Sequence, residues 1–507
     1  MRKECIEAYI EEHAKVKPRA PAIVVRGEVT SYQKLWEMVR GFALCLEQCG
    51  VTEGDVVVVK ASQTLSYAVS YFGTHLAHAV FAPAEKSVTL PGLDGFICET
   101  QAKVCITDKW QEELKERHPE LVCLLPSDVT ELARDAYCEE STYTFPDADD
   151  SADIFFTTGT TGSSKGVEIQ HHALVATAEN LIFGCGYKPD NLICVPGPLN
   201  HVNPVRKLFT SMVNGSAIAI FNGMLNMKAL FDTLDSWLYP VSLCLPPAMV
   251  RTILQNTGDK LGEYKDKIDF IESASAPLPE PDKLKLCELL PKSRLYNNYG
   301  SSESASVCMY DYQKYPGLVG CVGEMMPNSR IFITDDDGNE IASSKERPGL
   351  IACEGNVNMK GYYHAPELTA SVLKDGVVYT NDIGYIGEHG FVYIIGRKGD
   401  VINVGGLKVA PNEVEEVVLA FDGIRDCICV PMADAVSGQA VRLWVVPEDA
   451  SKFDRRALVR FLGTRLEKYK IPTVIDVTDE VPRTYNGKID RKRFDKETGE
   501  EFPSAIF

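Results

Sequence analysis

Features that would assign a protein to a membrane, a secreted or a nucleic-acid-binding class are missing from this sequence. No apolar run approaches the ~18 residues of a membrane-spanning helix, and the first residues lack the apolar core of a signal peptide. The sixteen cysteines include no Cys-x-x-Cys pair, so we expect reduced, buried thiols in a cytoplasmic protein rather than disulfides or zinc sites. Positive charge is scarce, and the net charge of −19 argues against a general nucleic-acid or membrane role.

The pattern of apolar segments predicts an α/β protein with more than one domain. The 507 residues are too many for one compact core. Helix-length segments such as 31–50 alternate with apolar runs such as Val56 to Val59, which is typical of parallel sheets covered by helices. The block Gly323 to Ile395 is rich in glycine and short strands, and we interpret it as a smaller β-rich subdomain. A Gly-Arg-Lys-Gly-Asp segment at 396–400 then precedes a self-contained unit of about a hundred residues.

The most specific local signal is a phosphate-binding loop in Ile154 to Val167. An apolar strand runs into a segment of Thr, Ser and Gly that contains Lys165. Glycines allow close approach of the backbone, while N–H groups, hydroxyls and a lysine can hold phosphate oxygens. The spacing is neither that of the Walker loop nor that of the dinucleotide fingerprint. A flexible Ser/Gly linker is the alternative, but linkers rarely lie between two apolar strand-like runs.

This loop resembles the signature of the adenylate-forming (AMP-binding) superfamily, which includes acyl-CoA synthetases, peptide-synthetase adenylation domains and luciferases. Four further segments resemble its other motifs in the right order: Tyr299 to Glu303, Tyr379 to Asp382, Gly396 to Glu415, and Pro482 to Lys488. The resemblance implies a large N-terminal AMP-binding domain (1–396), with two α/β subdomains plus a distorted β-barrel. A hinge (397–400) and a small mobile α+β C-terminal domain (401–507) would follow.

The resemblance also implies a set of nucleotide-binding residues. They are Thr158, Gly159, Thr160, Thr161, Gly162, Lys165, Ser275, Ala276, Pro277, Asn297, Tyr299, Gly300, Ser302, Asp382 and Arg397. Asn297 and Tyr299 would hold the adenine, and Asp382 would accept hydrogen bonds from both ribose hydroxyls. The family often has glycine where Ser275 stands, and usually glycine where Asn381 precedes Asp382; asparagine tolerates positive φ better than most residues.

Catalytic roles follow from the same resemblance for Glu303, Lys488 and His201. Glu303 would bind Mg²⁺, because a hard cation prefers a carboxylate and the phosphates of ATP. Lys488 would bridge the two anionic reactants, the carboxylate and the α-phosphate, and stabilise the charge that grows in the transition state.

The C-terminal part carries the residues implied for the second step. Gly405, Gly406 and Lys408 resemble the loop that serves the thioester step and the pantetheine tunnel. Gly399 stands at the hinge, where the family usually has Asp or Lys, and its effect on domain rotation stays open.

The acid pocket is expected around Pro198 to Val202 and Leu245 to Pro247. Acyl- and aryl-CoA ligases often have histidine where His201 falls, although a buried structural histidine is the alternative. Amino-acid-activating domains usually have Asp where this chain has Val202. The expected reaction is therefore ATP-dependent activation of a fatty or aromatic acid, not an α-amino acid, followed by transfer to coenzyme A. Two alternatives stay open: loading of a separate carrier protein, and a catalytically idle binding or structural protein.

Overall fold

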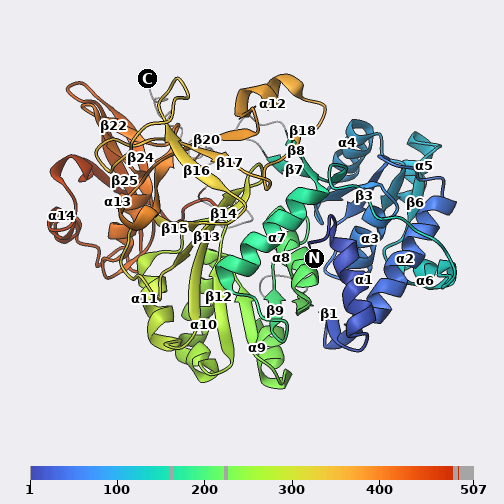
Figure 1. The fold of residues 1–507 in the computed structure, drawn as a ribbon. Helices are drawn as coiled ribbons and strands as arrows, with labels where there is room; N and C mark the ends of the chain where they lie inside the picture. Colours follow the sequence, from blue (N-terminus) through green and yellow to red (C-terminus); the bar gives the residue numbers. More distant parts are fainter. Residues whose placement is uncertain (1, 159–163, 222–226, 484–488, 490, 492–507) are drawn as a thin grey trace.

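The computed structural model describes residues 2–158, 164–221, 227–483, 489 and 491. Figure 1 shows a large α/β part, coloured from blue through green and yellow to light orange at α12, followed by a smaller C-terminal unit in darker orange and red. Among the helices of these described residues, none is both long and apolar enough to cross a bilayer.

A seven-stranded sheet is built mainly from the first third of the chain. Its strand order is β18-β8-β7-β4-β3-β5-β6, and β7, β4, β3, β5 and β6 run parallel. The strands are β3 (Val56–Lys60), β4 (Val80–Ala84), β5 (Val104–Ile106), β6 (Val122–Leu124), β7 (Ser151–Thr158), β8 (Ser164–Gln170) and β18 (Gly361–Tyr362). The four valines of β3 are buried, because helices cover both faces of a parallel sheet.

A fourteen-stranded sheet forms the centre of the large part. Its order is β16-β17-β20-β21-β15-β14-β13-β12-β11-β9-β10-β1-β2, with β19 beside β20. The strands are β1 (Pro21–Val25), β2 (Glu28–Ser31), β9 (Leu192–Val195), β10 (Ala217–Ile220), β11 (Val241–Cys244), β12 (Ile268–Ser273), β13 (Arg294–Ser301), β14 (Ala305–Asp311), β15 (Cys321–Met325), β16 (Arg330–Thr334), β17 (Gly349–Glu354), β19 (Leu373–Lys374), β20 (Val377–Ile386) and β21 (Val392–Arg397). The β-rich block predicted at Gly323 to Ile395 therefore continues this sheet, because β15 pairs with both β14 and β21.

Helices α7 (His171–Cys185) and α8 (Val202–Asn214) lie between the two sheets (Figure 1). Their apolar side chains belong to one buried cluster with residues of both sheets. The other helices of the large part are α1 (Ile6–Val16), α2 (Tyr32–Gln48), α3 (Leu65–Leu76), α4 (Leu90–Thr100), α5 (Gln111–Arg117), α6 (Val129–Ala136), α9 (Met227–Ser236), α10 (Pro247–Thr257), η1 (Gly258–Tyr264), α11 (Glu280–Leu289), α12 (Pro366–Val372) and η2 (Glu388–Gly390). The expected cap of α2 is present, since the Ser31 side chain accepts a hydrogen bond from the Lys34 N–H.

The C-terminal unit has its own five-stranded sheet and its own apolar core. It contains β22 (Ile402–Val404), β23 (Leu407–Val409), α13 (Pro411–Leu419), β24 (Ile424–Asp434), β25 (Gly438–Pro447), α14 (Arg455–Gly463), η3 (Lys468–Lys470) and β26 (Val474–Val477). Strand β21 of the large sheet ends at Arg397 and the small sheet begins at Ile402, so the predicted hinge at 397–400 starts on the last residue of β21 and otherwise lies between the two sheets. The domain limits 1–396 and 401–507 remain predictions.

Candidate functional site

The carboxyl ends of four neighbouring strands meet at one edge of the large sheet. Strands β9, β11, β12 and β13 are parallel neighbours. In open parallel sheets, ligands bind beyond the carboxyl ends of the strands, because the loops that follow converge there. The segments predicted for the acid and the nucleotide follow these strands: 198–202 after β9, 245–247 after β11, and 275–277 after β12.

A cavity opens between these segments. Its walls are formed by Val195, Gly197, Pro198, His201, Asn203, Pro204, Lys207, Cys244, Leu245, Pro246, Glu272, Ala274 and Ser275. The structure therefore places the predicted pocket residues Pro198, His201, Leu245 and Pro246 around one space. His201 is the residue before the first turn of α8 and is partly exposed.

Two charged residues that the sequence reasoning missed form an ion pair in this cavity. The Lys207 Nζ donates a hydrogen bond to Glu272 Oε1 over 2.8 Å, and both side chains are 2% exposed or less. Asn298 donates to the same carboxylate oxygen over 2.9 Å. Burial alone would lower the pKa of Lys207, but the Glu272 charge, the hydrogen bond to Glu272 and the nearby Cys244 and Cys185 together outweigh it, and the pKa is raised. Glu272 lies within the largely apolar strand β12, and a charged residue in such a run is the sequence signal that could have indicated a buried polar site.

Tyr299, Asp382 and Arg397, which were predicted to bind the adenine and the ribose, lie close together. The Tyr299 hydroxyl donates to Asp382 Oδ2 over 2.6 Å. Asp382 and Arg397 are opposite each other in the β20–β21 pair, with Arg397 Nε 3.5 Å from Asp382 Oδ1. Burial, and then the Asp382 charge, raise the pKa of Tyr299 well above its usual range. Asn381 lies within strand β20, so its position requires no left-handed backbone.

The other predicted adenine-contacting residues follow β12 or lie on β13. Asn297 is buried, and its Oδ1 lacks a hydrogen-bond partner among the described residues. Ser275 is exposed and has φ +76°, the left-handed region that favours glycine, and it is followed by Ala276 and Pro277. At Gly300 a Cβ atom would meet the Ala305 carbonyl oxygen at 1.7 Å, so only glycine fits this bulged pairing.

Glu303 lies in the turn that follows β13, close to Tyr362 of β18, which pairs with β8 of the hairpin predicted to bind phosphate. The Tyr362 hydroxyl donates to Glu303 Oε1 over 2.8 Å, and Lys165 Nζ lies 5.5 Å from the centre of the Tyr362 ring. The turn is closed by Ser301, whose Oγ accepts the Glu303 N–H. The predicted phosphate-contacting Ser302 lies in the same turn, partly exposed. Glu303, Lys165 and Ser302 are thus brought to one region.

Arg206, which the sequence analysis did not identify, donates a hydrogen bond to the backbone of this turn. Its Nη2 donates to the Ser301 carbonyl oxygen over 2.7 Å, and the residue is 5% exposed. Burial lowers the pKa of Arg206 to about 10, although the charges of Glu303 and Glu272 oppose that shift. The guanidinium therefore lies among carboxylates and stays charged at neutral pH.

Several predicted residues fall outside the description. Gly159, Thr160, Thr161, Gly162 and Lys488 lie outside the described residues. Thr158 ends β7, and only its backbone is described.

The loop predicted for the thioester step is a two-glycine hairpin turn between β22 and β23. Gly405 and Gly406 have φ +59° and +89°, values that a tight hairpin turn needs. Gly405 N–H donates to the Ser437 carbonyl, and Gly406 N–H donates to Asn403 Oδ1. Lys408 on the following strand is exposed.

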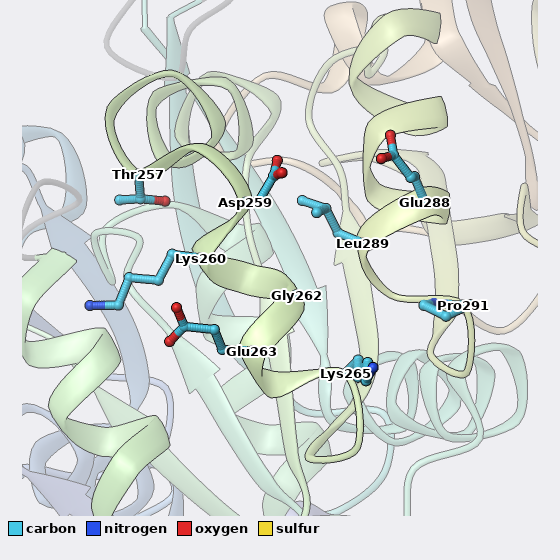
Figure 2. Close-up of a pocket in the computed structure, with 9 residues that line it drawn as sticks. All are labelled: Thr257, Asp259, Lys260, Gly262, Glu263, Lys265, Glu288, Leu289 and Pro291. Atoms are coloured by element: carbon cyan, nitrogen blue, oxygen red, sulfur yellow. The ribbon is translucent and has the colours of Figure 1, made fainter.

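An open groove of about 740 Å³ lies elsewhere, at the C-terminal ends of α10 and α11 (Figure 2). Charged side chains such as Lys260 and Glu263 line it. The cavity described above lies at the N-terminal end of α10, which is eleven residues long, so the groove is about 16 Å further along that helix. This groove is lined by exposed charged side chains and is separate from the cavity, so we do not include it in the candidate site.

Comparison with known proteins gives family matches over most of the chain. The family model "AMP-binding enzyme" matches residues 10–363, and "AMP-binding enzyme C-terminal domain" matches residues 413–488. A long-chain-fatty-acid–CoA ligase of Escherichia coli O157:H7 is 28% identical over 93% of this chain and 91% of its own. The 4-coumarate-CoA ligase 2 of Narcissus pseudonarcissus is 25% identical over 88% and 83%.

Solved structures share the fold at lower identity. ATP-bound MatB from Rhodopseudomonas palustris has a TM-score of 0.87 at 24% identity, covering 98% of this chain and 99% of that protein. The o-succinylbenzoate CoA synthetase MenE from Bacillus subtilis, solved with its acyl-adenylate intermediate, has a TM-score of 0.83 at 20% identity over 98% and 99%. Both matches extend over nearly the whole chain, so the overall fold is shared.

Proposed function

The chain belongs to the family of AMP-binding enzymes, and from this membership we propose which of its residues carry out each step of acid activation. The protein is an acid–CoA ligase that forms AMP. It activates a fatty or aromatic carboxylic acid with ATP to an acyl-AMP, releases pyrophosphate, and transfers the acyl group to coenzyme A. The observation that best supports the residue roles is the meeting of His201, Ser275, Asn297 and Glu303 at the strand ends of one sheet.

Asp382 is the ribose ligand in this proposal. Its carboxylate already accepts a hydrogen bond from Tyr299 and faces Arg397, so its geometry is fixed before the nucleotide arrives. A preorganised acceptor loses little entropy on binding. The unpartnered Oδ1 of Asn297 would accept a hydrogen bond from the adenine amino group, because a buried acceptor without a partner is costly. Tyr299 and the Ser275–Pro277 segment would enclose the base.

Glu303 is the proposed Mg²⁺ ligand. A carboxylate next to a phosphate-binding hairpin is the oxygen donor that Mg²⁺ prefers, with phosphate oxygens and water completing the shell. The Tyr362 hydroxyl holds one oxygen of Glu303, which orients the carboxylate. When bound, the ion would neutralise the phosphate charge that opposes attack by an anionic carboxylate. Lys165 would contribute a second positive charge at the phosphates.

Lys488 is the proposed catalytic lysine, and it lies outside the described residues. A carboxylate oxygen of the acid forms a bond to the α-phosphorus while the bond to pyrophosphate breaks. In the second step the coenzyme A sulfur attacks the acyl carbon, loses its proton and displaces AMP. Gly405, Gly406 and Lys408 would line the coenzyme A path after the C-terminal unit rotates about 397–400.

We place the reaction in the cytoplasm, because all sixteen cysteines are free thiols.

The first experiment supplies Mg·ATP, coenzyme A and a panel of fatty, aromatic and amino acids, and detects acyl-CoA and AMP by mass spectrometry. We expect a thioester from a non-amino acid. Lys488→Ala should lower the rate of adenylation about 10²–10³-fold, by analogy with the loss of a transition-state donor. Lys452→Ala, which removes an exposed lysine of the same unit, should leave the rate unchanged.

The panel also separates the alternatives. AMP formation without a thioester would contradict coenzyme A as acceptor and support a separate carrier protein. If no acid gives AMP and an ATP analogue fails to shift the melting temperature, the enzymatic assignment is wrong for this chain.

A further inference from the structure

One wall of the proposed acid cavity is formed by a buried ion pair between Lys207 and Glu272. Lys207 comes from α8 and Glu272 from β12, and their side chains meet at 2.8 Å with 1% and 2% exposure. Both residues line the same cavity as His201 and Pro246. The pair is therefore an internal wall of the cavity and not a surface feature.

The ammonium of Lys207 has unused hydrogen-bonding capacity. A lysine ammonium has three protons, and within the described part of the chain Lys207 donates one hydrogen bond, to Glu272 Oε1. Glu272 Oε1 accepts a second hydrogen bond, from Asn298 Nδ2. Buried donors without partners are costly, so the remaining Lys207 protons favour an acceptor inside the cavity.

An apolar acyl tail is a poor match for such a wall. Methylene groups packed on the pair would exclude water and leave the Lys207 donors without partners. The free space is also small, about 50 Å³, compared with the roughly 300–1,000 Å³ of pockets for drug-sized ligands. A long tail would have to displace the ion pair, and separating two buried charges is strongly unfavourable.

Resting on the proposed function, we propose that the acid is a short hydroxy acid whose distal hydroxyl binds between Lys207 and Glu272. The hydroxyl oxygen accepts from the ammonium, and the hydroxyl proton is donated to the carboxylate. His201 precedes α8 and Lys207 is the sixth residue of that helix, so the two positions are about 9 Å apart along the helix axis. An extended four-carbon acid that begins beside His201, with a hydrogen bond of about 2.8 Å between its distal hydroxyl and Lys207, spans this length.

Charge balance favours a neutral group over a second charge. The pair has no net charge, so a second carboxylate on the acid would gain from Lys207 but would be repelled by Glu272. A distal amine would be attracted by Glu272 and repelled by Lys207. A hydroxyl both donates and accepts and therefore satisfies both partners without adding charge. The cavity thus selects against long fatty acids, dicarboxylic acids and amino acids alike.

The test compares γ-hydroxybutyrate with valerate, which has a methyl group in place of the hydroxyl, and with glutarate and octanoate. We expect kcat/KM for γ-hydroxybutyrate to exceed that for valerate about 10²-fold or more, since sites built around a hydroxyl reject analogues that lack it. Equal or better use of valerate, octanoate or glutarate would overturn the proposal. The wild-type protein suffices for this comparison, so it does not depend on the folding of a variant.

A double variant, Lys207→Met with Glu272→Met, gives an independent test. Both charges are removed together, so neither is left unpaired in the core. We expect the preference to invert, with valerate and octanoate used better than γ-hydroxybutyrate, while the melting-temperature shift given by an ATP analogue is kept. An unchanged preference in a variant that still binds the analogue would overturn the proposal.

Failure of the subsite and failure of the proposed function are distinguishable. If wild-type protein forms AMP from valerate or octanoate in preference to the hydroxy acid, only the assignment of the distal hydroxyl falls. If it forms AMP from none of these four acids but does so from another acid of the first panel, such as an aromatic acid, only the subsite assignment falls. If no acid of either panel gives AMP, the ligase function itself is contradicted and this inference falls with it.

Discussion

Ser275 holds a backbone conformation that ordinarily belongs to glycine. Its φ is +76°, and it lies two residues after the end of β12. The side chain is exposed, so it lacks the tight packing that offsets strain of this kind elsewhere. A non-glycine residue in this region costs on the order of 1–3 kcal/mol. The loop therefore stores strain next to the proposed adenine site.

Replacing Ser275 with glycine should stabilise the protein. We expect Ser275→Gly to raise the free energy of unfolding by about 1 kcal/mol, because relief of the left-handed strain exceeds the added entropy of the unfolded chain. The measurement is the urea midpoint of the large part. Ser87→Gly serves as control: Ser87 is exposed in a loop with negative φ, and glycine there should lower stability. A midpoint that falls for both variants would contradict the strain argument.

At the scale of single residues, the sequence predicted identities better than conformations. The family resemblance already indicated glycine at the position of Ser275 and before Asp382. Only the structure separates them, because φ is positive at Ser275 whereas Asn381 is extended within β20. Side-chain orientation follows from neighbours that lie far away in the sequence. The 2.6 Å bond from Tyr299 to Asp382 joins residues 83 positions apart, and no local pattern predicts it.

At the scale of elements, apolar periodicity predicted strands such as β3 and helices such as α2. Their buried residues repeat with the spacing of one face or of a fully covered strand. Periodicity does not predict the surroundings of charged residues inside such elements. Glu7 on α1 and Asp153 on β7 are buried, although Glu and Asp side chains are mostly exposed. Their partner, His75, lies on α3, so burial is stabilised by a contact between elements.

His75 joins α1, α3 and β7 through a buried hydrogen-bonded chain. Its Nδ1 lies 3.0 Å from Glu7 Oε1 and its Nε2 lies 3.1 Å from Asp153 Oδ1. Tyr71 donates to the other oxygen of Asp153 over 3.0 Å. Burial alone would lower the pKa of His75, but the two carboxylates outweigh it and raise the pKa to about 9. His171 packs against the ring, and burial lowers its pKa well below the usual range.

This cluster predicts a loss of stability at alkaline pH. A histidine whose folded pKa is raised from 6.5 to about 9 contributes stability that is fully present below pH 6.5 and lost as pH rises through about 9. At about 1.4 kcal/mol per unit, the change is about 3 kcal/mol. We expect urea midpoints of wild-type protein to fall between pH 7 and about 9.5. His75→Gln should be less stable at pH 7 and should show a smaller fall across that range. Equal slopes would contradict a charged His75.

At the scale of the whole molecule, the docking of the C-terminal unit was beyond sequence reasoning. Helix α13 packs against β21 of the large sheet, and Glu416 on α13 has a buried Oε2 without a partner among the described residues. Lys283 and Glu280 of α11 act on it electrostatically from the large part. The domain boundary at 396–400 can be predicted from the sequence, because its Gly-Arg-Lys-Gly-Asp segment interrupts the succession of apolar strand-like runs. The orientation across it depends on contacts between residues more than a hundred positions apart.

Glu416 makes this docked arrangement sensitive to pH. Burial first, and then the charges of Glu280, Glu413 and Glu415, raise the pKa of Glu416 from 4.5 to about 7, while Lys283 opposes the shift. An acid whose pKa is raised favours the docked state when it is protonated. That contribution is present below pH 4.5 and is lost as pH rises through about 7.

We therefore expect proteolytic cleavage at 397–400 to become faster in wild-type protein as pH rises from 5.5 to 8, after correction for the protease's own pH dependence. Glu416→Gln removes the charge and keeps the shape, so its cleavage should stay slow at both pH values. Glu388→Gln, a change at an exposed glutamate of the large part, should behave as wild type. Cleavage of wild-type protein that does not change with pH, or a Glu416→Gln variant that follows the wild-type curve, would show that protonation of Glu416 does not control docking. Because rotation about this segment is the step proposed to bring Gly405 and Lys408 to the acyl-AMP, the same protonation would then bias the enzyme between its two reactions.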